Sequence, residues 1–243
     1  MGRASKIRLF VDAELGPGQA VELSPDQAHY LNAVMRRKPG DMLWLFNGRD
    51  GEWQAQITDA RKKIVRVHCG TGAAAQVRAQ ASGPDLWLLF APLKRARTDF
   101  VVEKAVEMGI SRLWPVFTEY TNSERIREDR ITAQMREAAE QCNRLDVPEL
   151  TAPARLSDAL ADWPADRALI FADEAAAGPA ALPRGKAAVL IGPEGGFSEA
   201  ERDRIQALPQ AVVLSLGPRI LRADTAAIAA LTAWQMAAGD WPR

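Results

Sequence analysis

Five short apolar runs after residue 85 alternate with segments of helical pattern, and this alternation constrains the fold more than any other feature. The runs cover residues 86–90, 113–117, 168–171, 187–191 and 212–216. Strand-length runs separated by helices are typical of βαβ units. We therefore expect an α/β fold here, a mostly parallel sheet with helices on both faces.

Local signals place the helices of this region. A helix over roughly 96–108 is predicted to end at Gly109, because glycine readily adopts the left-handed conformation that follows a helix. Ser198 and Glu201 form a capping box that starts another helix. Residues 225–238 are alanine-rich and apolar on most faces, which predicts a helix buried in the core or against a partner.

The front of the chain has a different pattern. Residues 1–70 contain short β-type runs at 7–11, 41–46, 52–57 and 64–67, with Asn-Gly and Asp-Gly hairpin signals between two of them. Ser24 and Pro25 are typical of a short helix start. Several short strands favour a small barrel. Small and polar residues follow, so we expect a β-rich domain over 1–72, a linker over 73–84 and the α/β domain over 85–243.

Charge and cysteine content narrow the classes of function only slightly. The whole chain has a formal net charge of zero, although residues 1–75 hold 11 lysines and arginines against 8 acidic residues. This mild excess fits contact of the front segment with nucleic acid. The two cysteines, Cys69 and Cys142, fit neither zinc spacing nor a disulfide framework. Without a signal-peptide pattern or a membrane-length apolar stretch, we expect a cytoplasmic protein.

The last two apolar runs each break into a glycine- and proline-rich turn. One reads Leu190-Ile191-Gly192-Pro193-Glu194-Gly195-Gly196-Phe197, and the other begins Leu214-Ser215-Leu216-Gly217-Pro218-Arg219-Ile220-Leu221-Arg222. If these turns end adjacent strands, they place two stretches of bare backbone at the same edge of the sheet. That edge is where α/β proteins bind small ligands. The competing interpretation is two tight strand–helix turns without a ligand.

The turns favour a ligand bound by main chain. Glycines permit close approach and positive φ, the prolines stiffen the turns, and the N–H groups of Ile220 and Leu221 would be free to bind. Neither turn is followed by the Gly-Lys-Ser/Thr of a phosphate loop. Neither has the Gly-x-Gly-x-x-Gly spacing of a dinucleotide-binding fold. No metal ligands occur at suitable spacing, so we expect no metal.

These residues resemble the 16S ribosomal RNA (uracil-N3)-methyltransferases of the SPOUT superfamily. The most specific part is Ile-Gly-Pro-Glu-Gly-Gly-Phe followed by Leu-Gly-Pro-Arg-Ile-Leu-Arg-x-x-Thr-Ala. The segments 29–41, 97–109 and 140–144 also resemble the family's motifs. The resemblance covers nearly the whole chain.

The resemblance implies a PUA-like β-barrel followed by a SPOUT α/β domain whose C-terminal segment forms a trefoil knot. It also implies a homodimer and a bound S-adenosylmethionine, with the adenine resting on backbone around Leu214 to Leu221. The implied cofactor-binding residues are Leu190, Ile191, Gly192, Pro193, Glu194, Gly195, Gly196, Leu214, Ser215, Leu216, Gly217, Ile220, Leu221, Thr225 and Ala226.

The implied reaction methylates N3 of a specific uridine in the small-subunit ribosomal RNA. The enzyme must align N3 with the methyl group and help to remove its proton. Arg222 would stabilise charge on the uracil oxygens, and Asp224 would orient Arg222 or accept the proton. The alternative is a structural ion pair at a helix start. The family usually has Arg-Thr-Glu-Thr where this chain has Arg222-Ala223-Asp224-Thr225, so the carboxylate is one methylene shorter.

Basic residues in the front domain are the candidates for contact with 16S ribosomal RNA or the 30S subunit. They are Arg8, His29, Arg36, Arg37 and Lys38. Each could equally belong to a solvated basic face, and the tryptophans Trp44 and Trp53 fit a core better than a base-stacking surface. Two further functions stay open. One is another SPOUT methyltransferase, acting on the ribose 2′-hydroxyl or on guanine N1, and the other is a non-catalytic RNA-binding module.

Overall fold

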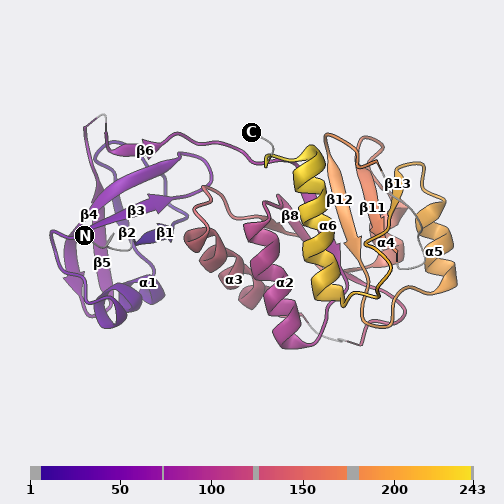
Figure 1. Cartoon of the computed structure of the whole chain (residues 1–243). Coiled ribbons are helices and arrows are strands. Elements are labelled where there is room, and N and C mark those ends of the chain that lie inside the picture. Colours follow the sequence, from indigo (N-terminus) through magenta and orange to yellow (C-terminus); the bar gives the residue numbers. More distant parts are fainter. Residues whose placement is uncertain (1–6, 73, 123–125, 174–180, 242–243) are drawn as a thin grey trace. The chain divides into compact units, whose positions relative to one another are not determined.

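The computed structural model describes residues 7–72, 74–122, 126–173 and 181–241, and the chain divides into two compact units (Figure 1). Unit 1 comprises Met1–Ser82 and Ala139–Val147. Unit 2 comprises Gly83–Ala138 and Pro148–Arg243. The second segment of unit 1 is thus taken from far along the chain.

Unit 1 is built on a six-stranded sheet with the order β1-β3-β4-β5-β2, in which β6 also pairs with β4. β1 is parallel to β3, and the other pairs are antiparallel. The strands are β1 (Arg8–Phe10), β2 (Ala20–Glu22), β3 (Met42–Phe46), β4 (Glu52–Arg61), β5 (Ile64–Cys69) and β6 (Gln76–Arg78). The runs predicted as strands are all confirmed, and the Asn-Gly and Asp-Gly signals lie between β3 and β4.

Two strands of this sheet were not predicted from the sequence. β2 and β6 have three residues each, too few to show a period of two. β6 lies within the segment expected to be a linker, and it is held by backbone pairing with β4 and by its Arg78 side chain.

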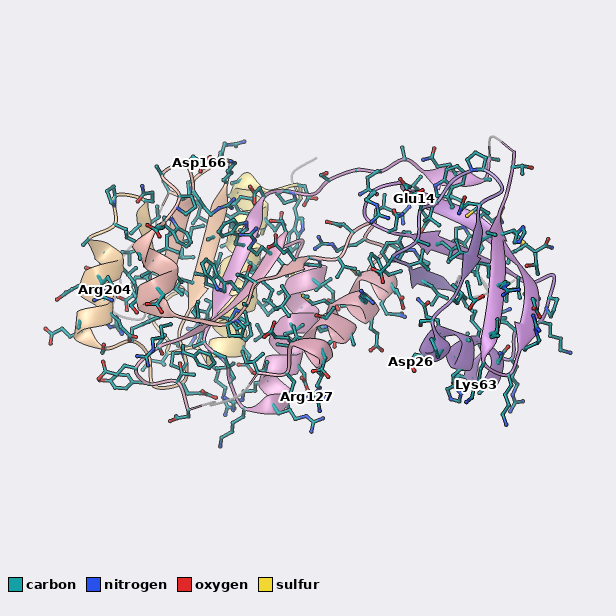
Figure 2. The ribbon with its side chains drawn as sticks, turned by 180° about the vertical axis from the view of Figure 1, so that it is seen from behind. Glu14, Asp26, Lys63, Arg127, Asp166 and Arg204 are labelled. Carbon is teal, nitrogen blue, oxygen red and sulfur yellow. The ribbon has the colours of Figure 1, made fainter. Side chains whose placement is uncertain are left out.

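A short helix follows β2. α1 (Pro25–His29) begins with Ser24 as its N-cap, in a capping box with Gln27, and continues directly into a π-helix at Tyr30–Val34. α1 packs near β5, so that Asp26 and Lys63 lie at the same end of unit 1 (Figure 2). The core beneath includes Leu31, Leu45 and Trp53, which confirms that Trp53 belongs to the core.

Unit 2 contains a seven-stranded sheet, all parallel, with the order β10-β8-β7-β12-β11-β13 and with β9 paired to β8. The strands are β7 (Leu86–Phe90), β8 (Arg112–Phe117), β9 (Glu149–Leu150), β10 (Ala154–Arg155), β11 (Ala168–Ala172), β12 (Ala187–Ile191) and β13 (Ala211–Leu214). The five predicted apolar runs therefore form strands of one parallel sheet, as expected for an α/β fold.

Helices cover this sheet. α2 (Arg95–Glu107) and α6 (Ala223–Ala238) lie side by side, with α6 against β12 (Figure 1). α4 (Leu156–Ala161) and α5 (Glu199–Gln206) contribute Leu156, Leu160 and Ile205 to a cluster with strand residues. α3 (Glu128–Gln141) begins in unit 2, and its residues from Ala139 onward belong to unit 1.

The predicted helix boundaries hold where a local signal marks them. Gly109 has φ of 80° after α2, and Ser198 caps α5 in a capping box with Glu201. The buried Gln235 of α6 donates to the Met108 carbonyl at 2.7 Å, which ties α6 to the end of α2. Both cysteines are free thiols. In the described part of the chain, no helix is long and apolar enough to cross a membrane.

One expectation about the sheet was wrong. The strands that end in the two glycine turns, β12 and β13, are not neighbours, because β11 lies between them and pairs with both. All three strands are parallel, so their carboxyl ends still share one edge. Asp166, which precedes β11, marks the opposite edge (Figure 2).

Candidate cofactor site

A cavity of about 310 Å³ lies at the carboxyl ends of β11, β12 and β13, entirely within unit 2. Its walls are the two glycine turns, the end of β11 and the start of α6. The lining residues are Ala172, Asp173, Ile191, Gly192, Pro193, Glu194, Gly195, Gly196, Phe197, Arg202, Leu216, Gly217, Arg219, Ile220, Leu221, Arg222, Ala223 and Ala226.

In the first turn, two glycines avoid close contacts and a third adopts a positive φ. A Cβ on Gly192 would lie 2.7 Å from the ring of Phe197, and a Cβ on Gly195 would lie 2.9 Å from the Cβ of Tyr120. Gly196 has φ of 71°, and its N–H donates to the Pro193 carbonyl at 3.0 Å. The Phe197 ring is buried edge-on against Phe171, so the turn is packed onto the core.

The second turn is open. Gly217 has φ of 99° and no heavy atom within 4 Å of a Cβ built on it. Ile220 is 83% exposed in the cavity lining, so its apolar side chain is accessible to a ligand. Within the residues that the structure describes, the N–H groups of Ile220 and Leu221 donate no hydrogen bond. The turn therefore offers apolar surface and main-chain donors together.

Charged side chains stand at two sides of the cavity. At the end of β11 the buried Asp173 forms an ion pair with Arg202 of α5, and Arg202 also donates to the Phe197 carbonyl at 3.4 Å. This pair neutralises the carboxylate and braces the first turn from the side of α5. Glu194 and Arg219 are exposed at the opening.

Arg97 of α2 spans the two turns. Its Nη1 lies 3.5 Å from Glu194 Oε1 in the first turn, and its Nε lies 3.9 Å from Asp224 Oδ2 at the start of α6. Asp224 therefore pairs with Arg97, and its Oδ1 also accepts from the Thr225 N–H at 3.0 Å. Arg222 is the N-cap of α6 with an exposed side chain that makes no ion pair within the described residues. Its guanidinium is thus available to a ligand.

Most of the residues predicted to bind the cofactor line this cavity, and four lie outside its lining. Leu190 and Leu214 are buried in the strands, and Ser215 and Thr225 follow β13 and begin α6. Of the two residues predicted to be catalytic, Arg222 lines the cavity. Asp224 lies outside the lining and pairs with Arg97.

Four residues at or beside the cavity were not predicted from the sequence: Ala172, Asp173, Arg202 and Arg97. Asp173 follows an apolar run directly, so the signal for it was the end of a third parallel strand. Arg202 and Arg97 lie on helices, and no local pattern marks their approach to the turns. Arg219, Phe197 and Ala223 lie within the two motifs but were not named as site residues.

The basic residues predicted to contact RNA belong to unit 1 and differ in exposure. His29, Arg36 and Lys38 are exposed, whereas Arg37 is half-buried with Nη1 4.0 Å from Asp41 Oδ2. The Arg8 side chain is only 5% exposed, and its Nε donates to Glu52 Oε1 at 2.5 Å. Its guanidinium is occupied inside the unit by Glu52 and backbone carbonyls, so it is not free to contact an RNA phosphate.

Glu52 is a buried carboxylate that holds two arginines. Burial opposes its ionisation, but hydrogen bonds from Arg78 and Arg8 outweigh that effect and hold the pKa of Glu52 below its ordinary value. The carboxylate therefore stays charged, which explains why Arg8 can be buried beside it.

Fold and site together define an α/β protein with a cofactor-sized pocket formed by main chain at the carboxyl edge of a parallel sheet, joined to a small β-rich unit. A family model described as an RNA methyltransferase domain matches residues 81–235, and a second one, an RNA methyltransferase PUA domain, matches residues 23–68. The chain belongs to the RNA methyltransferase family that the first of these describes.

Proteins of similar sequence and structure also support membership of the RNA methyltransferase family. Ribosomal RNA small subunit methyltransferase E of Rickettsia conorii is 29% identical over 232 residues, covering 92% of this chain and 93% of its own. The putative methyltransferase of Legionella pneumophila, solved in complex with bound SAM, superposes with a TM-score of 0.87 at 32% identity, covering 98% of this chain and 100% of that one. Ribosomal RNA small subunit methyltransferase E of Neisseria gonorrhoeae, bound to S-adenosyl methionine, has a TM-score of 0.87 at 26% identity over 97% and 99% of the chains.

Proposed function

We propose that this protein is an S-adenosylmethionine-dependent methyltransferase that modifies N3 of a specific uridine in the 16S ribosomal RNA of the small subunit. The observation that carries the proposal is the cavity between the two glycine turns, in a chain that belongs to the RNA methyltransferase family. The ribosomal RNA enzymes and SAM complexes to which it is similar support both the substrate and the cofactor.

The residues of the cavity suit this cofactor. Leu216, Ile220 and Leu221 offer apolar surface for the adenine ring, and the open N–H groups of the second turn suit its ring nitrogens. The first turn lets backbone approach closely, because a Cβ on Gly192 would meet Phe197. When bound, S-adenosylmethionine supplies an electrophilic methyl group on a sulfonium.

The chain must make uridine N3 nucleophilic and hold it in line with that methyl group. N3 carries a weakly acidic proton, and negative charge spreads to the uracil oxygens as the proton leaves. Arg222, exposed at the cavity wall without an intramolecular ion pair in the described residues, suits that charge. Stabilising the anion in a positioned complex is the contribution that we assign to Arg222.

Asp224 has a different role in this proposal. Its carboxylate lies near Arg97 and accepts from the Thr225 N–H. These contacts favour Asp224 as a residue that positions the start of α6, and with it Arg222. They favour this role over proton acceptance.

The architecture and assembly of the protein also form part of the proposal. The segment between Gly192 and Ala226 would be threaded as a trefoil knot, and the strands of unit 1 would form a PUA-like barrel. The protein would act as a homodimer in contact with the 30S subunit. Exposed apolar side chains in unit 2 support dimerisation, among them Phe100 of α2 and Met236 of α6, at 44% and 64% exposure. The domain bounds proposed are 1–72 and 85–243.

The decisive experiment incubates the purified protein with S-adenosylmethionine and 30S subunits from cells that lack this modification. Mass spectrometry of nuclease-digested 16S RNA is expected to show N3-methyluridine. Methyl transfer to a ribose 2′-hydroxyl or to guanine N1 would replace this proposal with another activity, and the absence of any methylation would reject it.

The role of Arg222 is tested in the same assay. Arg222→Ala is expected to lower kcat by about 10²-fold or more, as loss of a charge-stabilising donor does. Its affinity for S-adenosylmethionine should change little. Arg219→Ala, a neighbouring exposed arginine of the same turn, is the matched control and should retain most of kcat. Equal loss in both variants would assign Arg222 a general electrostatic effect instead.

A further inference from the structure

Unit 1 contains a small polar cavity that the proposed methyl transfer does not use. It measures about 230 Å³ and is lined by Ile7, Arg8, Tyr30, Met35, Glu140, Gln141 and Asn143. We call it the amide pocket, after its two amide side chains. Pockets for drug-sized ligands run from about 300 Å³ upward, so this one suits a single ring with its substituents.

The backbone around the amide pocket is held in costly conformations. Arg36 and Asn143 have φ of 51° and 64°, and they are the non-glycine residues with positive φ in the described part of the chain. Asn143 lines the pocket, and Arg36 follows its Met35. Such conformations cost about 1–3 kcal/mol each and gather at ligand sites.

The helix that supplies Tyr30 is also unusual. Residues Tyr30–Val34 form a π-helix, closed by the Met35 N–H donating to the Tyr30 carbonyl at 2.9 Å. π-helical turns are rare and occur frequently at functional sites. Two uncommon backbone features therefore meet at one cavity.

A network of buried charges fixes the other wall. Arg8 donates to the carbonyls of Ala139, Glu140 and Arg144 at 3.1, 2.8 and 2.6 Å. Arg78 donates to the Asn143 carbonyl at 3.0 Å, and Glu52 accepts from both arginines. The segment that carries Gln141 and Asn143 is thus anchored within unit 1 through its backbone carbonyls.

The groups left open in the amide pocket are suited to a nucleobase. Gln141, Asn143 and Tyr30 are exposed, and no side-chain hydrogen bond of theirs occurs within the described residues. An amide presents one donor and one acceptor side by side, which matches the edge of a base. The face of a tyrosine ring stacks on bases.

We propose that the amide pocket binds one unstacked nucleobase of single-stranded RNA, with Tyr30 stacking on the ring and Gln141 and Asn143 reading its edge. Arg36 and Lys38, exposed just beyond the π-helix, would contact the adjoining phosphates. This inference rests on the proposed function, since it makes unit 1 a second reader of the RNA substrate.

The test measures binding of 16S ribosomal RNA transcribed in vitro to the whole protein, by filter binding. Tyr30→Ala is expected to weaken binding about tenfold or more, since stacking on one base contributes about 1–3 kcal/mol. Tyr30→Phe keeps the ring and should bind within about twofold of the wild type. Gln141→Ala should weaken binding severalfold. Val34→Ala, an exposed residue of the same π-helix outside the pocket lining, is the matched control.

Salt dependence separates stacking from charge. Tyr30→Ala should leave the slope of log K against log salt unchanged, because stacking releases no counterions, whereas Arg36→Ala should reduce the slope by about 0.7–1. Asn143→Gly removes the amide and relieves the positive φ, so it should bind RNA more weakly while unfolding at the same temperature or higher.

The outcomes distinguish this inference from the proposed function. If the wild type methylates N3 but Tyr30→Ala and Gln141→Ala bind RNA as tightly as Val34→Ala, the amide pocket is not a base site. If the variants lose RNA binding and the wild type transfers no methyl group, the pocket stands and the proposed function fails. Equal S-adenosylmethionine affinity by calorimetry in all variants would show that unit 2 is intact. Failure of the wild type to bind RNA would overturn the inference directly.

Discussion

The two glycine turns that form the cofactor cavity are held in opposite ways. The first turn is fixed by contact: Gly192 leaves room for the Phe197 ring, Gly195 for Tyr120, and Ser198 caps the helix that follows. The second turn has few contacts. Gly217 has no neighbour within 4 Å of a Cβ, and Ile220 is 83% exposed.

This difference indicates that one turn is ordered before the ligand binds and the other is ordered by binding. Segments with few buried contacts open locally at low free energy cost, whereas packed segments open only when the domain unfolds. The first turn is therefore a rigid wall. Folding already orders its backbone, so ligand binding does not have to order it again. The second turn would gain its contacts from the ligand, so part of the binding free energy is used to order it.

The largest effect expected from breaking this contrast is that of Gly192→Ala. The added Cβ would lie 2.7 Å from the Phe197 ring, which is buried against Phe171 and cannot move cheaply. Overpacking of this kind costs about 1–3 kcal/mol of unfolding free energy. We expect that loss in denaturant titrations, together with loss of measurable cofactor binding by calorimetry. Gly83→Ala, with no heavy atom nearby and no positive φ, is the control and should change neither.

Ile220→Ala should have an intermediate effect, confined to binding. Because the side chain is exposed in the free protein, its removal should change the unfolding free energy by less than about 0.5 kcal/mol. Cofactor affinity should fall about tenfold, through apolar contact that only the complex makes. Calorimetry and thermal unfolding of the same sample measure both. A drop in stability without a drop in affinity would contradict the open character of this turn.

The smallest effect is expected from Arg97→Ala, which removes the side chain between the turns. Its contacts at 3.5 Å and 3.9 Å are partly exposed, and such ion pairs contribute about 0.2–1 kcal/mol. We expect cofactor affinity to fall at most about fivefold, and less at high salt. A double-mutant cycle with Asp224→Asn measures the coupling. A coupling near zero would mean that Arg97 does not act through Asp224.

The sequence predicted the parts of the fold that local chemistry determines. The capping boxes at Ser24 and Ser198 and the glycine after α2 act over three or four residues, so a short window contains the whole signal. Both turns were located for the same reason, since glycine permits conformations that other residues avoid and proline fixes its own φ. Five of the seven strands of the parallel sheet followed from apolar runs with helices between them, whereas β9 and β10, of two residues each, did not.

Long-range pairing could not be predicted in this way. Nothing in residues 168–172 indicates that β11 inserts between β12 and β13, because the order of parallel strands is decided by the whole sheet. Asp173 lines the cavity from the end of β11, Arg97 of α2 pairs with Glu194 and Asp224, and Arg8 is buried beside carbonyls of residues 139–144. From the sequence alone, a basic residue on a strand is expected to be a solvated charge, because its distant partner is not known.

The strand order has a consequence for the protein during its synthesis. β7 emerges early but pairs with β12, and the cavity also needs β13 and the first turn of α6. Domains on the ribosome acquire structure only as their segments become available. A nascent chain that ends before Ala226 therefore holds an incomplete pocket, and S-adenosylmethionine cannot assist the pairing of its earlier strands. The cofactor stabilises only the completed sheet, by mass action, so it protects the finished enzyme and gives no help to its precursor.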